Sequence, residues 1–339
     1  MRVQTVTGWD IGGVNIKRAD VAGSRVTSTL SCPFAIQRTP SALVGQLRAM
    51  CSQQSPVSDT HAVTMTAELS QLFRTKREGV AFVLDAFDEA FPNARVRVYT
   101  VDGRFISTAE ARDVPLRAAA SNWHATASIV ARSWRDATLV DIGSTTTDII
   151  PIRNGEVVAR GLTDLDRLAS RELLYLGAVR TPVEAVVQEV PIGDGTAGVS
   201  AESFALTGDV HVWQRDLSVG DYDADTTPDG RPVALEFVRE RLARIVCADR
   251  EMLDDPAIDV IARHVAQAQV ARTARAMSHV GGDARAPVVA AGIGAFIVHR
   301  AAALVGIPVV DLASVLGAEA ARIAPAAAVA LLLAADPAP

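Results

Sequence analysis

Cysteine is scarce in this sequence, and the few cysteines lie far apart. Cys32, Cys51 and Cys247 are the three cysteines among 339 residues. No Cys-x-x-Cys pair occurs, so the sequence predicts neither a disulfide framework nor a zinc knuckle.

Long apolar runs and basic runs are also missing. The longest apolar segment, residues 324–335, is too short to span a bilayer and predicts a packed terminal helix. The first residues show no basic segment followed by an apolar one, so we expect no signal peptide. The formal net charge is −6, which argues against a nucleic-acid or membrane surface. We therefore expect a cytoplasmic protein whose ligands are small molecules. A homodimer is one possible assembly.

What the sequence does contain is one tripeptide twice. Asp-Ile-Gly occurs at residues 10–12 and again at residues 141–143. In both places an apolar run suited to a buried strand precedes the aspartate, and strand-forming residues follow the glycine. A chain of 339 residues favours two domains. The repeat therefore predicts a duplicated domain, since a solenoid would repeat at a far shorter period.

The flanking patterns predict an α/β protein with a ligand cleft between its two halves. The first domain is expected at residues 1–133 and the second at 134–323, with the terminal helix 324–336 packed on the first. Strands are expected at 5–10, 14–21, 61–69, 95–99, 286–291 and 307–312. Residues 137–161 are expected to form three strands, separated by a glycine turn and an Asn-Gly turn. Helices are expected at 40–52, 73–91, 115–134, 232–253, 256–278 and 295–304.

The two Asp-Ile-Gly turns are candidate phosphate and metal sites. Glycine lets the backbone approach an oxygen-rich ligand closely, and N–H groups in such turns can bind anions. Carboxylates suit Mg²⁺, which makes Asp10 and Asp141 the candidate metal ligands. The candidate phosphate-binding residues in the turns are Gly12, Gly13, Asn15, Gly143, Ser144, Thr145 and Thr146. A pair of strand-ending turns without any ligand is the alternative.

Basic residues near these segments are further candidates. If the hairpin after the first turn brings Lys17 back to the cleft, its side chain reaches a phosphate bound at that turn. Otherwise Lys17 is an exposed strand lysine. Arg74 and Lys76 stand at the start of a predicted helix, where positive charge opposes the helix dipole. Their placement indicates an anionic ligand, although a solvated first turn has the same pattern.

Several segments of the chain, quoted below, together resemble the superfamily of acetate and sugar kinases, chaperone ATPases and actin. The resemblance is closest to its hydantoinase/oxoprolinase-like branch, and within it to short proteins of the tetrahydromethanopterin-linked one-carbon pathway. It covers most of the chain and is weakest over residues 193–232. The segments that carry it are "GWDIGGVNIK", "VTMTAELSQLFRTKREGV", "AAASNWHATA", "LVDIGSTTTDIIPI" and "TDLDRL". It implies two actin-like, ribonuclease H-like domains with a cleft between them.

The resemblance also implies an activity, that of the methanofuran-pathway synthases. Such a transferase displaces pyrophosphate from an aminomethyl-furanmethyl diphosphate with a tyramine- or tyrosine-type phenol, forming an aryl ether. Mg²⁺ is the implied cofactor, whereas ATP is possible but not expected. The two turns then bind the diphosphate of the substrate.

The phenol in that reaction needs a base, because its pKa lies near 10. His124, in "SNWHATA", is the first candidate. Asp148, after the threonine run, and Glu68, after "MTA", are the others; Glu68 also suits the substrate's amine. Each has a purely structural alternative, as a packed histidine or a strand-end carboxylate.

Other activities of the superfamily are alternatives. An ATP-dependent small-molecule kinase would use both turns for ATP. A third glycine turn, "AAGIGAF", occurs at residues 290–296. The corresponding turn on the adenosine side of such kinases usually contains more glycine. A hydantoin or oxoproline hydrolase usually needs a larger chain or partner subunits. A non-enzymatic sensor on the same fold is a further reading.

Residues 221–232, "DYDADTTPDGRP", superficially resemble a calcium loop. Thr226 stands where that loop needs glycine, and Pro232 stands where it needs glutamate. We expect a solvated, mobile loop instead.

Overall fold

The computed structural model describes residues 5–52, 58–222, 227–281 and 286–336. They form two compact units. Unit 1 takes the described residues of Met1–Ala137, Ile150–Ala169 and Leu312–Pro339; unit 2 takes those of Thr138–Ile149 and Ser170–Asp311. The domain boundaries expected from the sequence stay a prediction, because compact units and inherited domains need not coincide.

Unit 1 is built on a six-stranded sheet in the order β3-β2-β1-β4-β5-β6. Strands β1, β4 and β5 are parallel, whereas β2, β3 and β6 pair antiparallel with their neighbours. The carboxyl ends of the parallel strands therefore meet at one edge, where ligands commonly bind. The strands are β1 Thr5–Ile11, β2 Asn15–Ala22, β3 Arg25–Pro33, β4 Thr60–Met65, β5 Arg95–Tyr99 and β6 Phe105–Ser107.

Helices cover this sheet, and α2 shows why they form where they do. Thr75 caps its first turn by accepting a hydrogen bond from the N–H of Glu78. Val80, Val83 and Phe87 follow at helical spacing and are buried. The helices of unit 1 are η1 Pro40–Ala42, α1 Leu43–Ser52, η2 Ala67–Leu69, α2 Lys76–Ala90, α3 Thr108–Asp113, α4 Pro115–Ala118, α5 Asn122–Ser133, α6 Asp164–Ser170, α11 Ala313–Leu316, α12 Ala318–Arg322 and α13 Ala324–Ala335.

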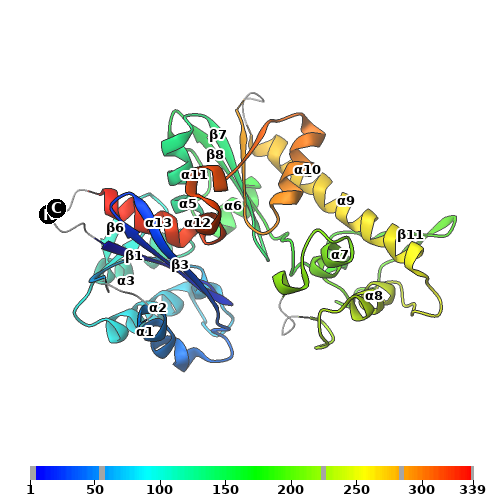
Figure 1. Ribbon diagram of the computed structural model, residues 1–339, viewed down its shortest axis with the longest axis horizontal. Helices are drawn as coiled ribbons and strands as arrows, with labels where there is room; N and C mark the ends of the chain where they lie inside the picture. The colour runs from blue at the N-terminus through cyan, green and yellow to red at the C-terminus, as the bar shows by residue number, and fades with distance from the viewer. Residues whose placement is uncertain (1–4, 53–57, 223–226, 282–285, 337–339) are drawn as a thin grey trace. The chain divides into compact units, whose positions relative to one another are not determined.

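Helix α13 is the central packing element of unit 1. It contacts β1, β2, β4 and α5, although it lies at the other end of the chain from β1 (Figure 1). A Cβ added at Gly8 of β1 would collide with the carbonyl oxygen of Ala326 and lie 2.8 Å from Cβ of Ala330. Alanine and glycine thus let the helix and strand backbones approach closely. An apolar helix of this kind is stable in water only when other elements surround it.

The predicted single helix over residues 115–134 was wrong. The chain leaves the helix after Ala118, and Ala119 forms a parallel bridge with Met65 at the end of β4. Ala120 then has a left-handed φ of 48° before α5 begins. Pairing with the sheet edge overrides the helix propensity of the alanines here.

The second sheet has the order β10-β8-β7-β13-β14, with β9 paired to β8. Strands β7, β13 and β14 are parallel, and β10 pairs antiparallel with β8. The strands are β7 Ala137–Ile142, β8 Thr147–Arg153, β9 Glu156–Val157, β10 Leu173–Leu174, β13 Val288–Ala291 and β14 Val309–Asp311. The predicted strand, glycine turn and helix over residues 286–304 is confirmed.

The other elements of unit 2 include a hairpin and a helix that the sequence did not predict, β11–β12 and α7. The predicted helix over 232–253 ends early, at Arg244, whereas the one predicted over 256–278 is confirmed as α9. These elements are η3 Val183–Ala185, β11 Glu189–Ile192, β12 Gly195–Gly198, α7 Thr207–Trp213, η4 Val219–Asp221, α8 Leu235–Arg244, α9 Asp255–Val280 and α10 Ala295–Val305.

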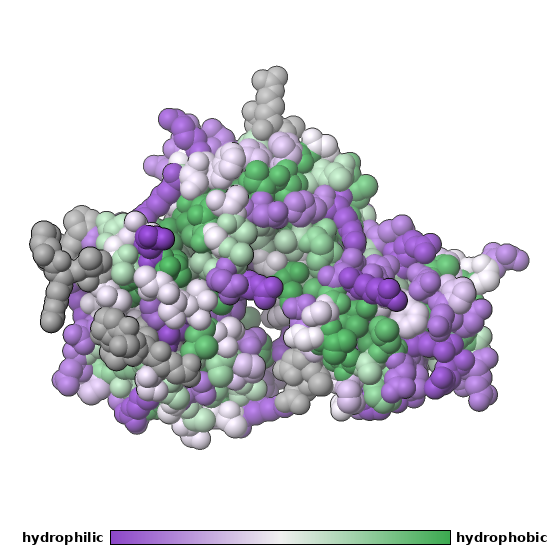
Figure 2. Space-filling model, in the orientation of Figure 1, coloured by the Kyte–Doolittle hydropathy of each residue, from purple (hydrophilic) through white to green (hydrophobic). Residues whose placement is uncertain are grey.

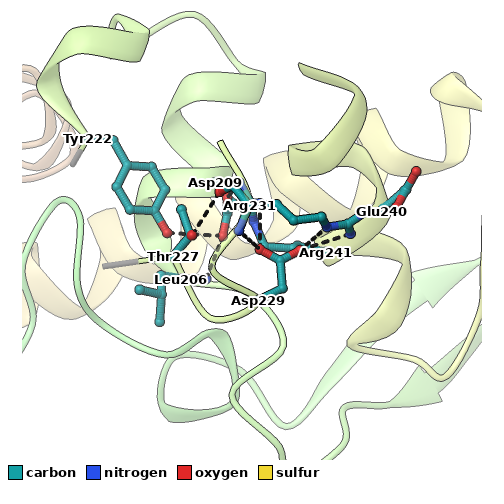
Figure 3. Close-up of polar contacts among 8 residues, drawn as sticks. All are labelled: Leu206, Asp209, Tyr222, Thr227, Asp229, Arg231, Glu240 and Arg241. Atoms are coloured by element: carbon teal, nitrogen blue, oxygen red, sulfur yellow. Dashed lines mark hydrogen bonds and ion pairs between the residues drawn. The ribbon is translucent and has the colours of Figure 1, made fainter. Parts of the chain in front are cut away.

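The loop expected to be solvated is instead fixed to a buried ion network (Figure 3). Arg241 of α8 is fully buried and donates to Asp209 of α7, with Nε–Oδ1 at 2.8 Å. The same guanidinium lies 3.1 Å from Oδ1 of Asp229. Tyr222 and Thr227 are only 2% and 8% exposed. The prediction of a free loop was therefore wrong for these residues, while 223–226 lie outside the described part.

None of the helices in the described ranges is long and apolar enough to cross a membrane. The longest, α9, has 26 residues but exposes charged side chains such as Asp259 and Arg263. Figure 2 shows mostly hydrophilic residues over the end of unit 2 that contains α8 and the β11–β12 hairpin.

The close approach of α13 to β1 leads to a stability prediction. Gly8→Val places a branched side chain against Ala326 and Ala330, and overpacking of this kind destabilises by roughly 1–3 kcal/mol. Urea unfolding followed by circular dichroism measures the difference. Gly45→Ala is the matched control, because Gly45 is an exposed helical residue with open space at its Cβ; it should gain roughly 0.5–1 kcal/mol. Equal stability of Gly8→Val and wild type would contradict the tight packing.

Candidate functional site

The two Asp-Ile-Gly turns close with the same hydrogen bond. The N–H of Gly12 donates to the carbonyl of Asn15 at 3.0 Å, and the N–H of Gly143 donates to the carbonyl of Thr146 at 2.9 Å. In each case the donor is two residues after the aspartate and the acceptor is five after it. The sequence repeat is thus a repeat of local structure, at the ends of β1 and β7.

In unit 1 the turn places a lysine against the aspartate. Antiparallel pairing sets Lys17 of β2 directly opposite Asp10 of β1. The lysine Nζ lies 3.5 Å from Oδ2 of Asp10. The other oxygen, Oδ1, is buried and has no hydrogen-bond partner among the described residues. Burial raises the pKa of Asp10 above its ordinary value, against the opposing effect of Lys17.

Glu68 lies at the same edge of the sheet, just beyond β4. The residue is 2% exposed, and neither of its carboxyl oxygens has a hydrogen-bond partner in the part of the chain that the structure describes. The N–H groups of Glu68 and Ala120 face the carboxyl group without forming hydrogen bonds of ordinary geometry. Burial raises the pKa of Glu68 to about 8, although the ammonium of Lys76 opposes the shift.

Lys76 connects Glu68 to a carboxylate that the sequence did not single out. Its Nζ lies 2.6 Å from Oδ2 of Asp164 and 4.0 Å from Oε1 of Glu68. Asp164 begins α6, where the hydroxyl of Thr163 and the carboxylate of Asp166 bond each other at 2.7 Å. The signal was present in "TDLDRL", in which Thr163 marks the start of a helix.

Arg167, one helical turn after Asp164, adds a second contact from α6. Its guanidinium carbon lies 4.1 Å from the ring centroid of Trp123, a cation–π contact. Residues three apart share a helix face. Helix α6 thus brings a carboxylate to Lys76 and a guanidinium to α5.

The basic residues at the start of α2 are not alike. Lys76 lies at the positive end of the helix dipole, where the carboxylate of Asp164 compensates its charge. Arg74 is exposed, and its backbone N–H donates to the carboxylate of Glu78 at 2.8 Å. The phosphate-binding roles of Arg74 and Lys76 stay predictions.

His124 belongs to a different polar cluster of unit 1. Its Nδ1 lies 3.0 Å from the hydroxyl of Tyr99 and 3.2 Å from the hydroxyl of Ser128. Burial lowers the pKa of His124 to about 4, so the imidazole is neutral at neutral pH. Its contacts with the described residues do not include Asp10 or Glu68. Asp148, the other candidate base, lies in β8 opposite Leu173 of β10.

In unit 2 the carboxylate of Asp141 lies against glycine backbone. Asp141 pairs with Ala291 of β13, and the next residue, Gly292, has a φ of 79°. A Cβ at Gly292 would collide with Oδ1 of Asp141. The N–H of Gly294 donates to the carbonyl of Ile142 at 2.9 Å. The "AAGIG" turn before α10 is therefore fitted to the Asp-Ile-Gly turn.

Gly177 packs against the Asp-Ile-Gly turn of unit 2. A Cβ there would collide with the carbonyl oxygen of Ser144, and that carbonyl accepts the N–H of Arg180 at 2.8 Å. The hydroxyls of Ser144 and Thr145 lie 3.4 Å apart. The backbone carbonyl is thus satisfied within unit 2. Sequence reasoning missed Gly177, whose need for glycine is created by contacts distant in the chain.

The donors present fit a magnesium ion that keeps most of its water. No group of three or more metal-ligating side chains occurs among the described residues. Mg²⁺ in proteins commonly uses one or two carboxylates, several waters and phosphate oxygens of the substrate. Asp10, with its buried unpartnered oxygen, and Asp141, at its glycine turn, are each suited to supply one carboxylate.

Most of the chain matches the model of a known protein family. The model described as hydantoinase/oxoprolinase matches residues 59–335. A protein of Methanocaldococcus jannaschii named (4-{4-[2-(γ-L-glutamylamino)ethyl]phenoxymethyl}furan-2-yl)methanamine synthase is 39% identical over 257 residues, 75% of each chain. A protein of Methanococcus vannielii with the same name is 39% identical over 127 residues, 37% of this chain and 56% of its own.

Solved structures show the fold. An acetone carboxylase, in a nucleotide-free structure, superposes with a TM-score of 0.55 at 12% identity, covering 98% of this chain and 70% of that chain. At such identity the likeness shows the fold alone. The predicted α/β class with actin-like units is confirmed.

The buried carboxyl of Glu68 leads to a pH-dependent stability prediction. The folded chain keeps this proton up to about pH 8, while the unfolded chain loses it near the ordinary value of 4.5. Stability due to the protonated form is therefore lost as pH rises from 4.5 through 8. Glu68→Gln cannot ionise, so its stability relative to wild type should rise by a few kcal/mol over that range, at about 1.4 kcal/mol per pKa unit.

Urea unfolding at pH 5, 6, 7 and 8 measures this difference. Glu319→Gln is the matched control, because it removes an exposed carboxylate from the same unit. A stability difference between Glu68→Gln and wild type that stays constant from pH 5 to 8 would show that Glu68 is ionised throughout.

Proposed function

The chain belongs to the hydantoinase/oxoprolinase family, and from this membership and the geometry of unit 1 we propose that it is a synthase forming the aryl ether of a methanofuran-type cofactor. The name of its relatives describes a product in which a phenol oxygen is joined to a furanylmethyl carbon. In the proposed reaction, a tyramine- or tyrosine-type phenol displaces pyrophosphate from an aminomethyl-furanmethyl diphosphate. One C–O bond to diphosphate breaks, one C–O bond to the phenol forms, and the phenol proton passes to a base.

The leaving group determines most of what the protein must provide. The furan oxygen delocalises positive charge at the methylene carbon, so departure of the diphosphate is limited chiefly by its own negative charge. Fixed N–H donors and cations at the leaving oxygens stabilise that charge. Mg²⁺, when bound, would neutralise part of the diphosphate charge.

Each unit contributes candidate groups for this purpose. In unit 1 the turn of Gly12 and Gly13, the Asn15 side chain and Lys17 follow Asp10, the proposed metal ligand, in the chain. Because the N–H of Gly12 closes the turn onto Asn15, the N–H of Gly13 is the proposed backbone donor to the phosphate, and Gly12 allows the ligand a close approach. In unit 2 the backbone of Gly143 and the hydroxyls of Ser144, Thr145 and Thr146 follow Asp141, the second proposed ligand. Arg74, exposed at the start of α2, is proposed as a further phosphate contact.

The proposed mechanism rests on the buried carboxyl group of Glu68 and its raised pKa. A base works best when its pKa lies near the working pH and not too far below that of its substrate. The pKa of about 8 at Glu68 is much closer to that of a phenol than the value of about 4 at His124. We therefore assign the proton transfer to Glu68, with Lys76 and Asp164 as positioning residues. His124 and Asp148 are the competing candidates.

The decisive experiment measures pyrophosphate release from an aminomethyl-furanmethyl diphosphate and γ-glutamyltyramine, with Mg²⁺ and without ATP. Release that requires the phenol, with the ether detected by mass spectrometry, establishes the synthase. No release, together with ADP formation when ATP and a candidate acceptor are supplied, would identify a kinase instead.

The assignment of Glu68 predicts a pH profile. Since the carboxylate is the active form, kcat should rise about tenfold per pH unit until it levels off near pH 8. Glu68→Gln should lower kcat at least roughly 100-fold and flatten this limb. If His124→Gln removes the limb and Glu68→Gln keeps it, His124 is the base. Glu319→Gln serves as the control for removal of a carboxylate.

The assignment of Asp141 predicts a loss of turnover without a loss of fold. Asp141→Asn keeps the shape of the side chain but removes the negative charge that a metal ion requires. Pyrophosphate release should fall at least roughly 100-fold, while the circular dichroism spectrum and unfolding midpoint stay close to wild type. Near-normal turnover at limiting Mg²⁺ concentration would remove Asp141 from the mechanism.

A further inference from the structure

Unit 2 contains a cavity of about 1130 Å³ that the proposed reaction does not use. Its walls are the end of α7, the start of α8, one face of α9 and the side of α10. None of its lining residues belongs to either Asp-Ile-Gly turn or to the glycine turn before α10. The cavity therefore needs an explanation of its own.

The acidic residues of this cavity already have partners. Asp216 accepts hydrogen bonds from both terminal nitrogens of Arg300, at 2.6 and 2.7 Å. Asp255 lies 2.9 Å from Nε of Arg239. The third, Asp259, accepts the indole N–H of Trp213 at 2.6 Å. A cationic ligand would have to compete with these contacts.

Two of its basic residues, in contrast, have no such partner. The guanidinium groups of Arg215, after α7, and Arg263, on α9, form no ion pair with any residue in the described ranges. A guanidinium offers paired N–H donors that match carboxylate, sulfonate or phosphate groups. The unused hydrogen-bonding capacity of the cavity thus favours an anionic group.

The remaining surface of the cavity is apolar. Ala266, Val270 and Ala271 line it along α9. At its rim Leu235 and Leu304 are 47% and 65% exposed, although both are large hydrophobic side chains. A ligand with an apolar body would cover these side chains while its anionic group met the arginines.

Buried polar contacts hold one wall in place. The backbone N–H of Asp216 donates at 2.8 Å to the carbonyl of His211, which is fully buried. Its Nε2 lies 2.8 Å from Oε1 of Gln269, whose amide donates to the carbonyl of Gly177 at 2.9 Å. Asp216, and with it Arg300, is therefore positioned from inside the unit. The cavity is preformed, which lowers the entropy lost on binding.

From these observations we propose that the cavity is a binding site for a small organic anion with an aryl or alkyl body. The charge of its free groups selects the anion, and its apolar wall selects the body. This inference is independent of the proposed function, because it concerns none of the residues assigned to the reaction.

The test titrates the full chain with 1-anilinonaphthalene-8-sulfonate, a sulfonate on an aromatic body, and follows its fluorescence. We expect saturable binding of one dye per chain. Arg263→Gln should weaken it about tenfold or more, since a charge-assisted hydrogen bond is lost. Arg275→Gln is the matched control: Arg275 is an exposed arginine of the same helix that does not line the cavity. Its affinity should equal that of wild type.

Displacement experiments then identify the anionic group. Phenyl phosphate and phenylacetate are each titrated against the bound dye, and the stronger competitor shows whether phosphate or carboxylate is preferred. The proposal is overturned if binding does not saturate, or if Arg263→Gln and Arg275→Gln weaken it equally. Unfolding midpoints of both variants confirm that a lost affinity does not reflect a lost fold.

Discussion

The candidate site depends on a carboxyl group kept in the protein interior without a full set of partners. Glu68 is placed there by three elements: β4, which ends just before it, the break after α4, and α2, whose Gly79 leaves no room for a Cβ beside it. Raising the pKa from 4.5 to about 8 corresponds to roughly 4–5 kcal/mol against ionisation. The fold must offset that from packing elsewhere, such as α13 on β1. Such uncompensated groups concentrate at functional sites.

The two Asp-Ile-Gly turns have the same backbone geometry but different surroundings. Both Asp-Ile-Gly turns close with an equivalent hydrogen bond between residues two and five positions after the aspartate. Asp10 then meets a lysine from its own hairpin, whereas Asp141 meets the backbone of a glycine turn about 150 residues later in the chain. A duplicated turn thus retains its backbone geometry while its electrostatic neighbours diverge. Short-range hydrogen bonds preserve the first, and tertiary packing determines the second.

Errors in the sequence predictions have a common physical origin. The alanine-rich residues 115–134 favour a helix locally, but Ala119 gains a bridge to Met65 that a continuous helix would forbid. The acidic residues 221–232 look solvated locally, but Asp229 meets Arg241, a buried cation that requires a carboxylate. In both segments a partner distant in sequence outweighs the local preference.

By itself the sequence determined the parallel strands of both sheets, the glycine turns, the terminal helix and the family, because these follow from short-range periodicity and from motifs within a few residues. Asp10, Asp141 and Glu68 were identifiable as candidates for the same reason. Only the tertiary structure decided that Asp164 joins Lys76, that His124 is bound by Tyr99 and neutral, and that Glu68 is buried. Burial and long-range pairing set pKa values, and neither is encoded in the residues adjacent to the group.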